Sequence, residues 1–501
     1  MRPCTARIVS AADLLATLGE LLPTRDLDPH RRLRMAYARK MRDGGLEVLY
    51  CLSQGAGHPY LMLRVRPDGN RLPSLANRFP FMGWYEREMH DLFGLDIDGH
   101  PEPYPLVLHE GAAHVHPMLQ APPDLPIQFA EAPPRVPAMI GPEIQRLPFG
   151  PVRADIAESA QFLFFYIGEG ILHYHPRLFY KHRGMEQRFE GSSLPTGAIL
   201  SERISGTDSV AHALAYCQAC EIALGWVPPR RAVWIRVILA ELERLTNHLH
   251  YFGALAKMTT LKVADAQGHW LEEQVRQING ALTGSRFLRG ILCVGGLRRD
   301  LDLTSLPVAL DAIEADVTLY LGKLDDTRSY LDRLIGTGRL TREIAFDQGA
   351  TGPVERASGM DRDLRRDLPY SGYGDLRIEI PMQSAGDAWA RACIRRDEIR
   401  VSLTLLRQCL ELIEPGPIRT DQAQSDPDPE GEGLGWSEGT RGALYYAVHY
   451  DPKREIFERV KIKDPSFSNW RVFPFTVEDT NLMDYAINEA SFGLSIAGAD
   501  R

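Results

Sequence analysis

The segment Glu202–His212 concentrates side chains whose types can do chemistry: Arg203, Ser205, Asp208 and His212. Histidine titrates near neutral pH and arginine binds anions through paired hydrogen bonds, so Arg203 and His212 could hold an anion or carry protons. Ser205 and Asp208 offer the hard oxygen ligands that magnesium and calcium prefer. One hydroxyl and one carboxylate are too few for a metal cage, so the segment alone does not predict a metal site.

The same residues also have a purely structural interpretation. The pattern predicts a helix that runs to Ala223, and either Asp208 or Ser209 is placed to cap its first turn. His212 would then be a core histidine.

Charged residues also interrupt a long apolar helix that is predicted from Pro228–Pro229 to about Met258: Glu241, Glu243, Arg244 and His248. Buried charges are costly unless they are paired. On the core side of the helix these residues would suggest a protein–protein face or a proton path. The periodicity does not decide which side they occupy.

Cysteine and glycine patterns argue against several cofactor sites. The seven cysteines are an odd and scattered set, which favours reduced thiols. Cys217 and Cys220 fall within a predicted helix, and no second pair completes a zinc site, so we interpret them as core residues. Val294–Leu297 and Ser371–Gly374 lack the strand–GxGxxG–helix context of a dinucleotide fold and are interpreted as turns. We expect no NAD site in this chain.

Composition indicates a globular protein with more than one domain. The chain has 501 residues, 44% of them hydrophobic and 25% charged, with a net charge of −9. That charge gives no reason to expect a nucleic-acid partner. No window approaches the roughly 20 apolar residues of a membrane span, and the first residues lack the apolar core of a signal peptide. We expect a cytoplasmic chain that can still dock on a membrane complex.

The fold class predicted is α+β, with a small N-terminal α/β domain at 1–115. An Arg-rich, helix-like segment at about 28–43 precedes two predicted strands, Leu46–Leu52 and Leu61–Val65, and a turn at Pro67–Asn70. Residues 116–146 are rich in proline, which removes amide donors, and are interpreted as an extended linker.

From 147 to 501 the pattern predicts a large, mainly helical domain with minor β-structure. Helical periodicity continues after Met258 in three further segments, at about 262–282, 306–335 and 385–414. An acidic loop is predicted from Thr420 to Gly435. It is followed by a hairpin in which Arg441–Tyr450 pairs with Ile456–Ile462.

Two blocks resemble known families. Tyr85–Leu95, followed by Gly99–Pro101, is similar to the signature of the 30-kilodalton subunit of respiratory complex I. Residues 141–501 resemble the 49-kilodalton subunit and, more closely, the large subunit of group 4 membrane-bound nickel–iron hydrogenases of the formate-hydrogenlyase type. Five segments carry the closer match: Pro148–Val152, Leu178–Glu186, Glu241–Leu249, Asp464–Trp470 and Asn488–Phe492.

The metal-ligand positions of that family are replaced. Against the hydrogenase pattern Arg-x-Cys-Gly-x-Cys-x-x-x-His, the residues Arg203, Gly206 and His212 match, whereas the two cysteine positions hold Ser205 and Asp208. In the C-terminal Cys-x-x-Cys pattern the cysteine positions hold Ser495 and Gly498. Nickel and low-spin iron need soft thiolate ligands, so we predict no nickel–iron centre. Arg441 matches the arginine beside the metal in that family.

Two further features bear on the resemblance. Complex I relatives place a quinone-binding His and Tyr at positions that align with Arg153 and, within about a residue, Gly206. Neither quinone hydrogen-bond donor is retained. In nickel-containing relatives an extension beyond the last cysteine motif is removed during maturation. The chain stops at Arg501, as expected of a protein that is never loaded with nickel.

The resemblance implies a catalytic-subunit-like scaffold of an energy-converting, complex I-like membrane complex. The remnant cavity would contain Arg203, Ser205, Asp208, His212 and Arg441. It would pass electrons to a small acceptor or couple conformational change to ion translocation. The expected partners are an iron-sulfur small subunit, which would hold the terminal cluster, and antiporter-like membrane subunits. No cofactor is expected in this chain, which would lie peripherally on the cytoplasmic side of the membrane.

Two alternatives remain open at this level. The chain could be a purely structural or assembly subunit with no electron transfer. It could also reduce quinone in a remodelled pocket.

Overall fold

The structure is a computed structural model of the 501-residue chain. It describes residues 4–22, 27–109, 115–119, 136, 141–153, 158–478 and 480–501. Most of the predicted proline-rich linker, 116–146, therefore lies outside the described residues.

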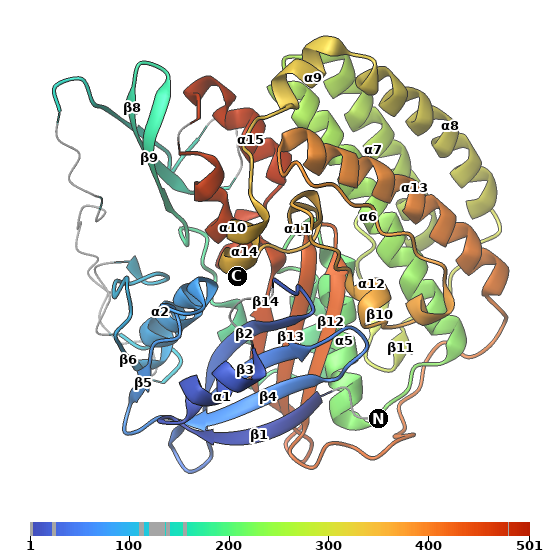
Figure 1. The fold of residues 1–501 in the computed structure, drawn as a ribbon. Helices are drawn as coiled ribbons and strands as arrows, with labels where there is room; N and C mark the ends of the chain where they lie inside the picture. The colour runs from blue at the N-terminus through green and yellow to red at the C-terminus, as the bar shows by residue number, and fades with distance from the viewer. Residues whose placement is uncertain are drawn as a thin grey trace.

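The N-terminal part is built on a four-stranded sheet with strand order β1-β4-β3-β2 (Figure 1). Its elements are β1 (Cys4–Ser10), α1 (Leu14–Leu21), β2 (Arg31–Lys40), β3 (Leu46–Gln54) and β4 (Tyr60–Arg66). The two predicted strands are confirmed as β3 and β4. The predicted turn at Pro67–Asn70 is confirmed by the Asp68–Arg71 bridge that closes it.

The helix-like segment predicted at 28–43 is wrong, because it forms strand β2. Antiparallel pairing with β3 buries most of β2, and its arginines find partners that local periodicity cannot reveal. Arg34 donates to Ser53 Oγ at 2.8 Å, and Arg39 pairs with Glu47 at 2.6 Å. Long-range pairing thus overrides a local pattern that suggests a polar helix.

The 30-kilodalton-like signature forms helix α2 (Gly83–Phe93), which ends at Gly94 in a left-handed conformation with a φ of 63°. Around it lie β5 (Arg71–Pro73), η1 (Pro80–Met82) and β6 (Asp96–Asp98). A three-stranded sheet follows the proline-rich segment and was not predicted: β7 (Gln145–Phe149), β8 (Gln161–Ile167) and β9 (Gly170–Arg177).

The larger part of the chain is mainly helical, as predicted. It begins with α3 (Met185–Phe189), α4 (Leu194–Ser201), α5 (Ser209–Leu224), α6 (Arg230–Met258) and α7 (Lys262–Thr283). The helical segment predicted at 306–335 is two helices, α8 (Leu306–Asp325) and α9 (Arg328–Leu334). The segment predicted at 385–414 is α13 (Ala388–Leu412). In Figure 1, α6, α7, α8 and α13 form a bundle beside the sheets.

Short elements complete this part. They are β10 (Leu292–Cys293), β11 (Gly296–Leu297), α10 (Arg342–Gln348), α11 (Pro353–Ala357), α12 (Leu364–Asp367), η3 (Tyr373–Asp375), α14 (Pro465–Val472), η4 (Phe473–Thr476), η5 (Leu482–Asp484), α15 (Tyr485–Phe492) and α16 (Ile496–Asp500). Val294–Leu297 and Ser371–Gly374 lie in short hairpin and turn structures, as predicted.

A buried antiparallel sheet occupies the centre of the molecule: β12 (Glu432–Gly439), β13 (Gly442–Asp451) and β14 (Ile456–Lys463) (Figure 1). The predicted hairpin is confirmed as β13–β14, whereas the predicted acidic loop ends earlier, because β12 starts at Glu432. Helix α5 packs closely on β12. A Cβ at Gly435 would lie 2.0 Å from the Ala215 carbonyl oxygen, so this approach requires glycine.

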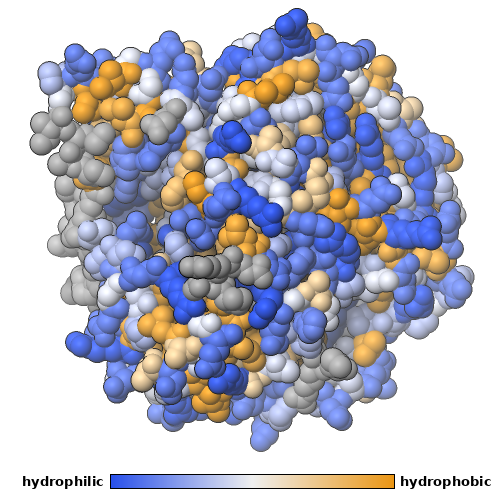
Figure 2. Space-filling model, viewed as in Figure 1, coloured by the Kyte–Doolittle hydropathy of each residue, from blue (hydrophilic) through white to orange (hydrophobic). Residues whose placement is uncertain are grey.

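The opposite face of the central sheet packs on the N-terminal sheet. Tyr60 donates to Tyr445 Oη at 3.1 Å, and Tyr37 lies 2.9 Å from His449 Nε2. The α+β class is therefore confirmed. Among the described residues, no helix combines the length and hydropathy that crossing a membrane requires. The face shown in Figure 2 is mostly hydrophilic, with a hydrophobic group in the region where Figure 1 draws the β8–β9 hairpin. Ile167 and Leu172 of this hairpin are half-exposed.

Candidate functional site

Three segments far apart in the sequence meet at the start of α5: the loop before it, the β12–β13 turn and the C-terminal segment. Asp208 is fully buried there. Arg441 Nη1 donates to Asp208 Oδ2 at 2.7 Å, and Thr440 Oγ1 donates to Oδ1 at 2.6 Å. Arg441 Nη1 also donates to Thr207 Oγ1 at 2.6 Å. Both carboxylate oxygens of Asp208 are therefore used within the protein.

The two serines at positions that match hydrogenase cysteines, Ser205 and Ser495, also come together. Ser205 Oγ donates to Ser495 Oγ at 3.4 Å and lies 3.0 Å from Thr207 Oγ1. Ser495 is the N-cap of α16, where its hydroxyl accepts from the Gly498 amide at 3.0 Å. The tertiary structure thus brings together all four predicted ligand positions, but with hydroxyl, carboxylate and glycine in place of thiolate.

His212 is fully buried and hydrogen-bonded at both ring nitrogens. Its Nε2 lies 3.1 Å from Asp464 Oδ2, and its Nδ1 lies 3.0 Å from the Tyr446 hydroxyl. Burial alone would raise the pKa of Asp464, but the hydrogen bond and charge of His212 hold it below its usual value. This Asp–His–Tyr chain can relay a proton, because histidine exchanges protons at either nitrogen.

Asp464 also fills the space of a side chain at position 498. A Cβ built on Gly498 would lie 2.5 Å from Asp464 Oδ2. Asp464 is held by His212 and by the Ser466 amide, which donates to Oδ1 at 2.6 Å. The backbone at Gly498 is therefore packed directly against a carboxylate, with no room for a cysteine side chain.

Arg203, a predicted cavity residue, does not join the others. Its side chain is 50% exposed, and its Nη1 donates to the Ile199 carbonyl oxygen at 2.8 Å. A residue outside the predicted set, Arg183, links the two remnant segments instead. It donates to the carbonyl oxygens of Ile204 at 2.6 Å and of Ala497 at 3.1 Å.

Asp208 or Ser209 was predicted to cap the first turn of α5. Asp208 does occupy the N-cap position, but its side chain does not accept a hydrogen bond from the helix amides. Its carboxylate accepts from Arg441 and Thr440. Glu243 of α6 instead accepts from the amides of Val210 at 2.7 Å and Ala211 at 2.9 Å. Burial and the nearby Asp208 charge raise the pKa of Glu243 to about 8. Glu243 therefore adds a group that titrates near neutral pH.

The four charged residues singled out within α6 lie on the core side. Glu241, Glu243, Arg244 and His248 are buried. Arg244 donates to the Gly439 carbonyl oxygen at 3.2 Å, beside the β12–β13 turn, and its Nε lies 3.3 Å from Glu241. This arrangement connects the turn that carries Arg441 to the interior of the helical bundle.

The interior network centres on Glu398 of α13. Its carboxylate contacts His248 at 2.6 Å, Arg365 at 3.6 Å and Arg244 at 3.8 Å, and it forms a close ion pair with Arg356. Burial is the main reason that the pKa of His248 falls to about 4, so this histidine is neutral at physiological pH. The network therefore consists of paired guanidinium and carboxylate groups.

A pocket of about 440 Å³ opens next to the cluster around Asp208 and Arg441. Asn247, Thr440, Arg441 and Gly493 line it on the side of the Asp208 cluster, and His250 and His269 line it elsewhere. Thr440 and Arg441 are the members of the Asp208 cluster that line this pocket.

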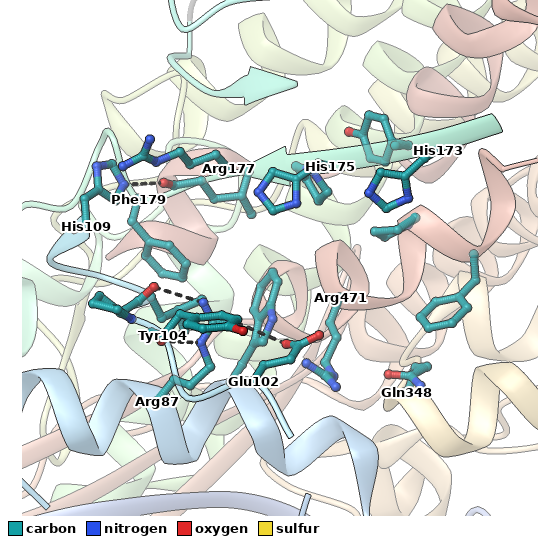
Figure 3. A pocket seen from close by; sticks show the side chains of 18 of the residues that line it. Arg87, Glu102, Tyr104, His109, His173, His175, Arg177, Phe179, Gln348 and Arg471 are labelled. Atoms are coloured by element: carbon teal, nitrogen blue, oxygen red, sulfur yellow. Dashed lines mark hydrogen bonds and ion pairs between the residues drawn. The ribbon is translucent and has the colours of Figure 1, made fainter. Parts of the chain in front are cut away.

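A second pocket, of about 340 Å³, lies between α2, β9 and α14 (Figure 3). Its walls carry both basic and acidic side chains, because Glu102 pairs with Arg87 and Glu478 pairs with His173. His173, His175 and Arg177 alternate along β9, with Arg87 and Arg471 from the helices. Burial, His173 and Arg177 lower the pKa of His175 to about 4, and burial lowers that of Arg471 to about 10. The sequence signal for this pocket is the His-x-His-x-Arg alternation, and none of its residues is among the predicted site residues.

The remaining motif predictions concern cysteine. Cys217 and Cys220 are fully buried within α5, as predicted for core residues, and burial raises their pKa values far above that of a free thiol. The four remnant positions do not fit a nickel–iron centre. They carry no thiolate, their one carboxylate is neutralised by Arg441, and Asp464 fills the space beside Gly498.

Comparison with protein families matches two parts of the chain. Residues 9–123 match the 30 Kd subunit of respiratory-chain NADH dehydrogenase, and residues 270–501 match its 49 Kd subunit. The order of the two matches is that of a fused chain.

Individual relatives extend over most of the sequence. The chain is 30% identical to the C/D subunit of NADH-quinone oxidoreductase from Cereibacter sphaeroides, over 88% of this chain and 83% of that protein. It is also 30% identical to formate hydrogenlyase subunit 5 of Escherichia coli, over 88% of this chain and 79% of that protein. Among solved structures, it resembles a chain of the membrane-bound sulfane sulfur reductase, described as an archaeal respiratory membrane complex. The TM-score is 0.68 at 26% identity, over 72% of this chain and all of that one.

Proposed function

Because the chain belongs to the family that contains the C/D subunit of NADH-quinone oxidoreductase and formate hydrogenlyase subunit 5, we propose that it is a subunit of an energy-converting, complex I-like membrane oxidoreductase without a nickel–iron centre. One observation supports the absence of a nickel–iron centre. The four positions that match hydrogenase cysteines are together in space, but they offer only Ser205, Asp208, Ser495 and Gly498. Soft metals have no suitable ligand there.

The cluster around Asp208 and Arg441 serves as the remnant cavity of this subunit. It either passes electrons to a small acceptor or couples conformational change to ion translocation. The buried ionic network favours coupling, because it connects the β12–β13 turn through Arg244 to Glu398 and His248. A change of charge at Asp208 or Glu243 would be felt by this network, since charges interact strongly where water is excluded. Arg203 lies outside the cluster and has no part in this role.

The partners of this chain are inferred from the same family membership. An iron-sulfur small subunit would pack on this chain and hold the terminal cluster, and antiporter-like membrane subunits would anchor the assembly. The chain itself holds no electron-transfer cofactor in this proposal and lies peripherally on the cytoplasmic side of the membrane. Its relative, the sulfane sulfur reductase, is described as a respiratory membrane complex, which supports an assembly of several subunits.

Elemental analysis of the purified assembled complex tests the absence of a nickel–iron centre. We expect iron at cluster stoichiometry without nickel, together with an iron-sulfur signal in electron paramagnetic resonance. Nickel at one per chain, retained when surface histidines are replaced, would overturn the proposal. A complex with neither metal would favour the purely structural alternative.

A second experiment separates coupling from a structural role. Asp208→Asn removes the buried charge that pairs with Arg441, whereas Asp300→Asn removes a half-exposed partner of Arg231 at 2.8 Å. We expect Asp208→Asn to lower turnover or ion translocation at least about 10-fold while the subunits still assemble, and Asp300→Asn to leave both unchanged. Assembly with full activity in Asp208→Asn would support a purely structural subunit.

The quinone alternative finds little support in the described residues. Arg153, at the position of the quinone-binding histidine, is buried, pairs with Glu489 at 3.2 Å and stacks on Phe149 at 4.5 Å. Gly206 has no side chain to donate a hydrogen bond. A quinone-site inhibitor that competed with substrate in the assembled complex would restore this alternative.

A further inference from the structure

Two histidines and a glutamate converge where α6 and α7 pack together, at one end of the pocket of about 440 Å³. His250 Nδ1 lies 3.0 Å from Glu272 Oε2, and His269 Nδ1 lies 3.1 Å from the same oxygen. One nitrogen from each histidine and one oxygen from Glu272 all fall within 4.8 Å of one another. His250 comes from α6, and the other two come from α7 at a spacing of three residues, so one face of each helix supplies them.

These separations suit a metal ion. Two ligand atoms at bond lengths of about 2.1 Å are separated by roughly 3.0 Å in octahedral and 3.4 Å in tetrahedral coordination. The two nitrogen–oxygen distances, 3.0 and 3.1 Å, fall at the lower end of that range. Two imidazoles and one carboxylate are a ligand set that first-row divalent metals accept.

The surroundings orient the ligands as metal sites require. The other ring nitrogen of His269, Nε2, lies 3.2 Å from Asp265 Oδ1. With an ion bound, a hydrogen bond from Nε2–H to this carboxylate would leave the Nδ1 lone pair free to bind the metal. Arg276 pairs with the other oxygen, Glu272 Oε1, and so fixes the carboxylate with Oε2 facing the two histidines. Glu272 itself is 5% exposed at its side chain, which makes it a rigid ligand.

The two histidines are open to the pocket and to solvent, with side chains 47% and 40% exposed, so an ion can enter. We propose that His250, His269 and Glu272 form a binding site for a first-row divalent metal ion of the Zn²⁺ class, with Asp265 as the orienting carboxylate. Three protein ligands leave at least one coordination position for water or a small ligand. The bound ion would join α6 to α7 at the pocket that also exposes Arg441.

This inference is independent of the proposed redox role, since it concerns a different cluster on the other side of the pocket. It also sharpens the nickel experiment, because imidazole and carboxylate ligands bind Ni²⁺ as well. Nickel that disappears in His269→Gln belongs to this site. Nickel that persists in that variant would belong elsewhere and would contradict the absence of a nickel–iron centre.

The test is metal titration of the untagged, full-length, metal-free chain. Zn²⁺ binding is measured by calorimetry, and Co²⁺ binding is measured by visible absorption, which reports ligand type and geometry. We expect one tight site per chain and a Co²⁺ spectrum without a thiolate charge-transfer band. Loss of a carboxylate that orients a metal-binding histidine typically weakens affinity about 10–100-fold. Asp265→Asn should therefore bind at least about 10-fold more weakly, and His269→Gln or His250→Gln at least about 100-fold more weakly.

The control is His58→Gln, which removes an exposed histidine from the β3–β4 turn and should bind as the unaltered chain does. Because His250 and His269 are half-exposed, their variants should fold, and circular dichroism checks this. The proposal is overturned if His250→Gln and His269→Gln, folded, bind Zn²⁺ as tightly as the His58 variant. A thiolate band with Co²⁺ would overturn it too, by assigning the ion to cysteine.

Discussion

Glu398 is the residue whose loss should disturb the interior most. Its two carboxylate oxygens face three guanidinium groups, those of Arg244, Arg356 and Arg365, and all four side chains are almost fully buried. Glu398→Gln keeps the shape of the side chain and one acceptor oxygen but removes the negative charge. The prediction therefore concerns charge and not packing.

The magnitude follows from the charges that remain. Burial and the Asp363 charge raise the pKa of Glu438 to about 7, so at pH 6 Glu438 is mostly protonated. The three arginines then face only Glu241 and Asp363 as ionised carboxylates. Leaving a buried charge without its partner costs about 3–5 kcal/mol. We expect Glu398→Gln to lower the free energy of unfolding by that amount.

The assay is urea unfolding at pH 6, followed by tryptophan fluorescence. The matched control is Glu314→Gln, which removes the same charge from a half-exposed pair with Arg407 and should cost at most about 1 kcal/mol. If both variants lose the same small amount, then the arginines are compensated by other groups or by water, and the picture of Glu398 as the centre of the network is refuted.

Two further predictions concern buried groups elsewhere. Gly498→Ala would place a Cβ 2.5 Å from Asp464 Oδ2 and disturb the hydrogen bond between Asp464 and His212. Thermal unfolding should therefore show that the free energy of unfolding falls by about 1–3 kcal/mol. Gly322→Ala, where an added Cβ meets nothing within 4 Å, should be neutral or slightly stabilising, and equal effects of the two would contradict the close packing. Burial raises the pKa of Glu86 from 4.5 to about 7, so as pH rises the unfolded chain loses this proton before the folded chain does. The free energy of unfolding should therefore fall by roughly 3 kcal/mol between about pH 4.5 and pH 7 and then level off. Glu86→Gln should remove that part of the pH dependence, and an unchanged slope in unfolding midpoints would show that Glu86 is not the responsible group.

Local patterns predicted the elements whose apolar residues are distinctive along the chain. Helix α6 repeats apolar positions at helical spacing, whereas β3 and β4 are short, nearly continuous apolar runs that are buried on both faces. Strand β2 was predicted as a helix-like segment, since its arginines look solvent-exposed until β3 and the central sheet supply Glu47 and Glu432 as partners. The β7–β9 sheet was not predicted, because its first strand, β7, begins within the proline-rich segment 116–146 that was interpreted as a linker.

Residue type alone was enough to predict which chemistry is missing. Ser205, Asp208, Ser495 and Gly498 cannot act as soft ligands in any conformation, and motif order alone was enough to predict a fused, complex I-like chain. These conclusions depend on the identity of each side chain, which folding does not change.

Which of the predicted residues act together became visible only in the folded chain. Packing separates Arg203 from the cluster, pairs Asp208 with Arg441, and turns Glu243 toward the amides of α5. It also brings His250 of α6 beside His269 of α7. Contacts between residues distant along the chain depend on how helices and sheets pack, and the strength of each charge depends on the burial that this packing creates.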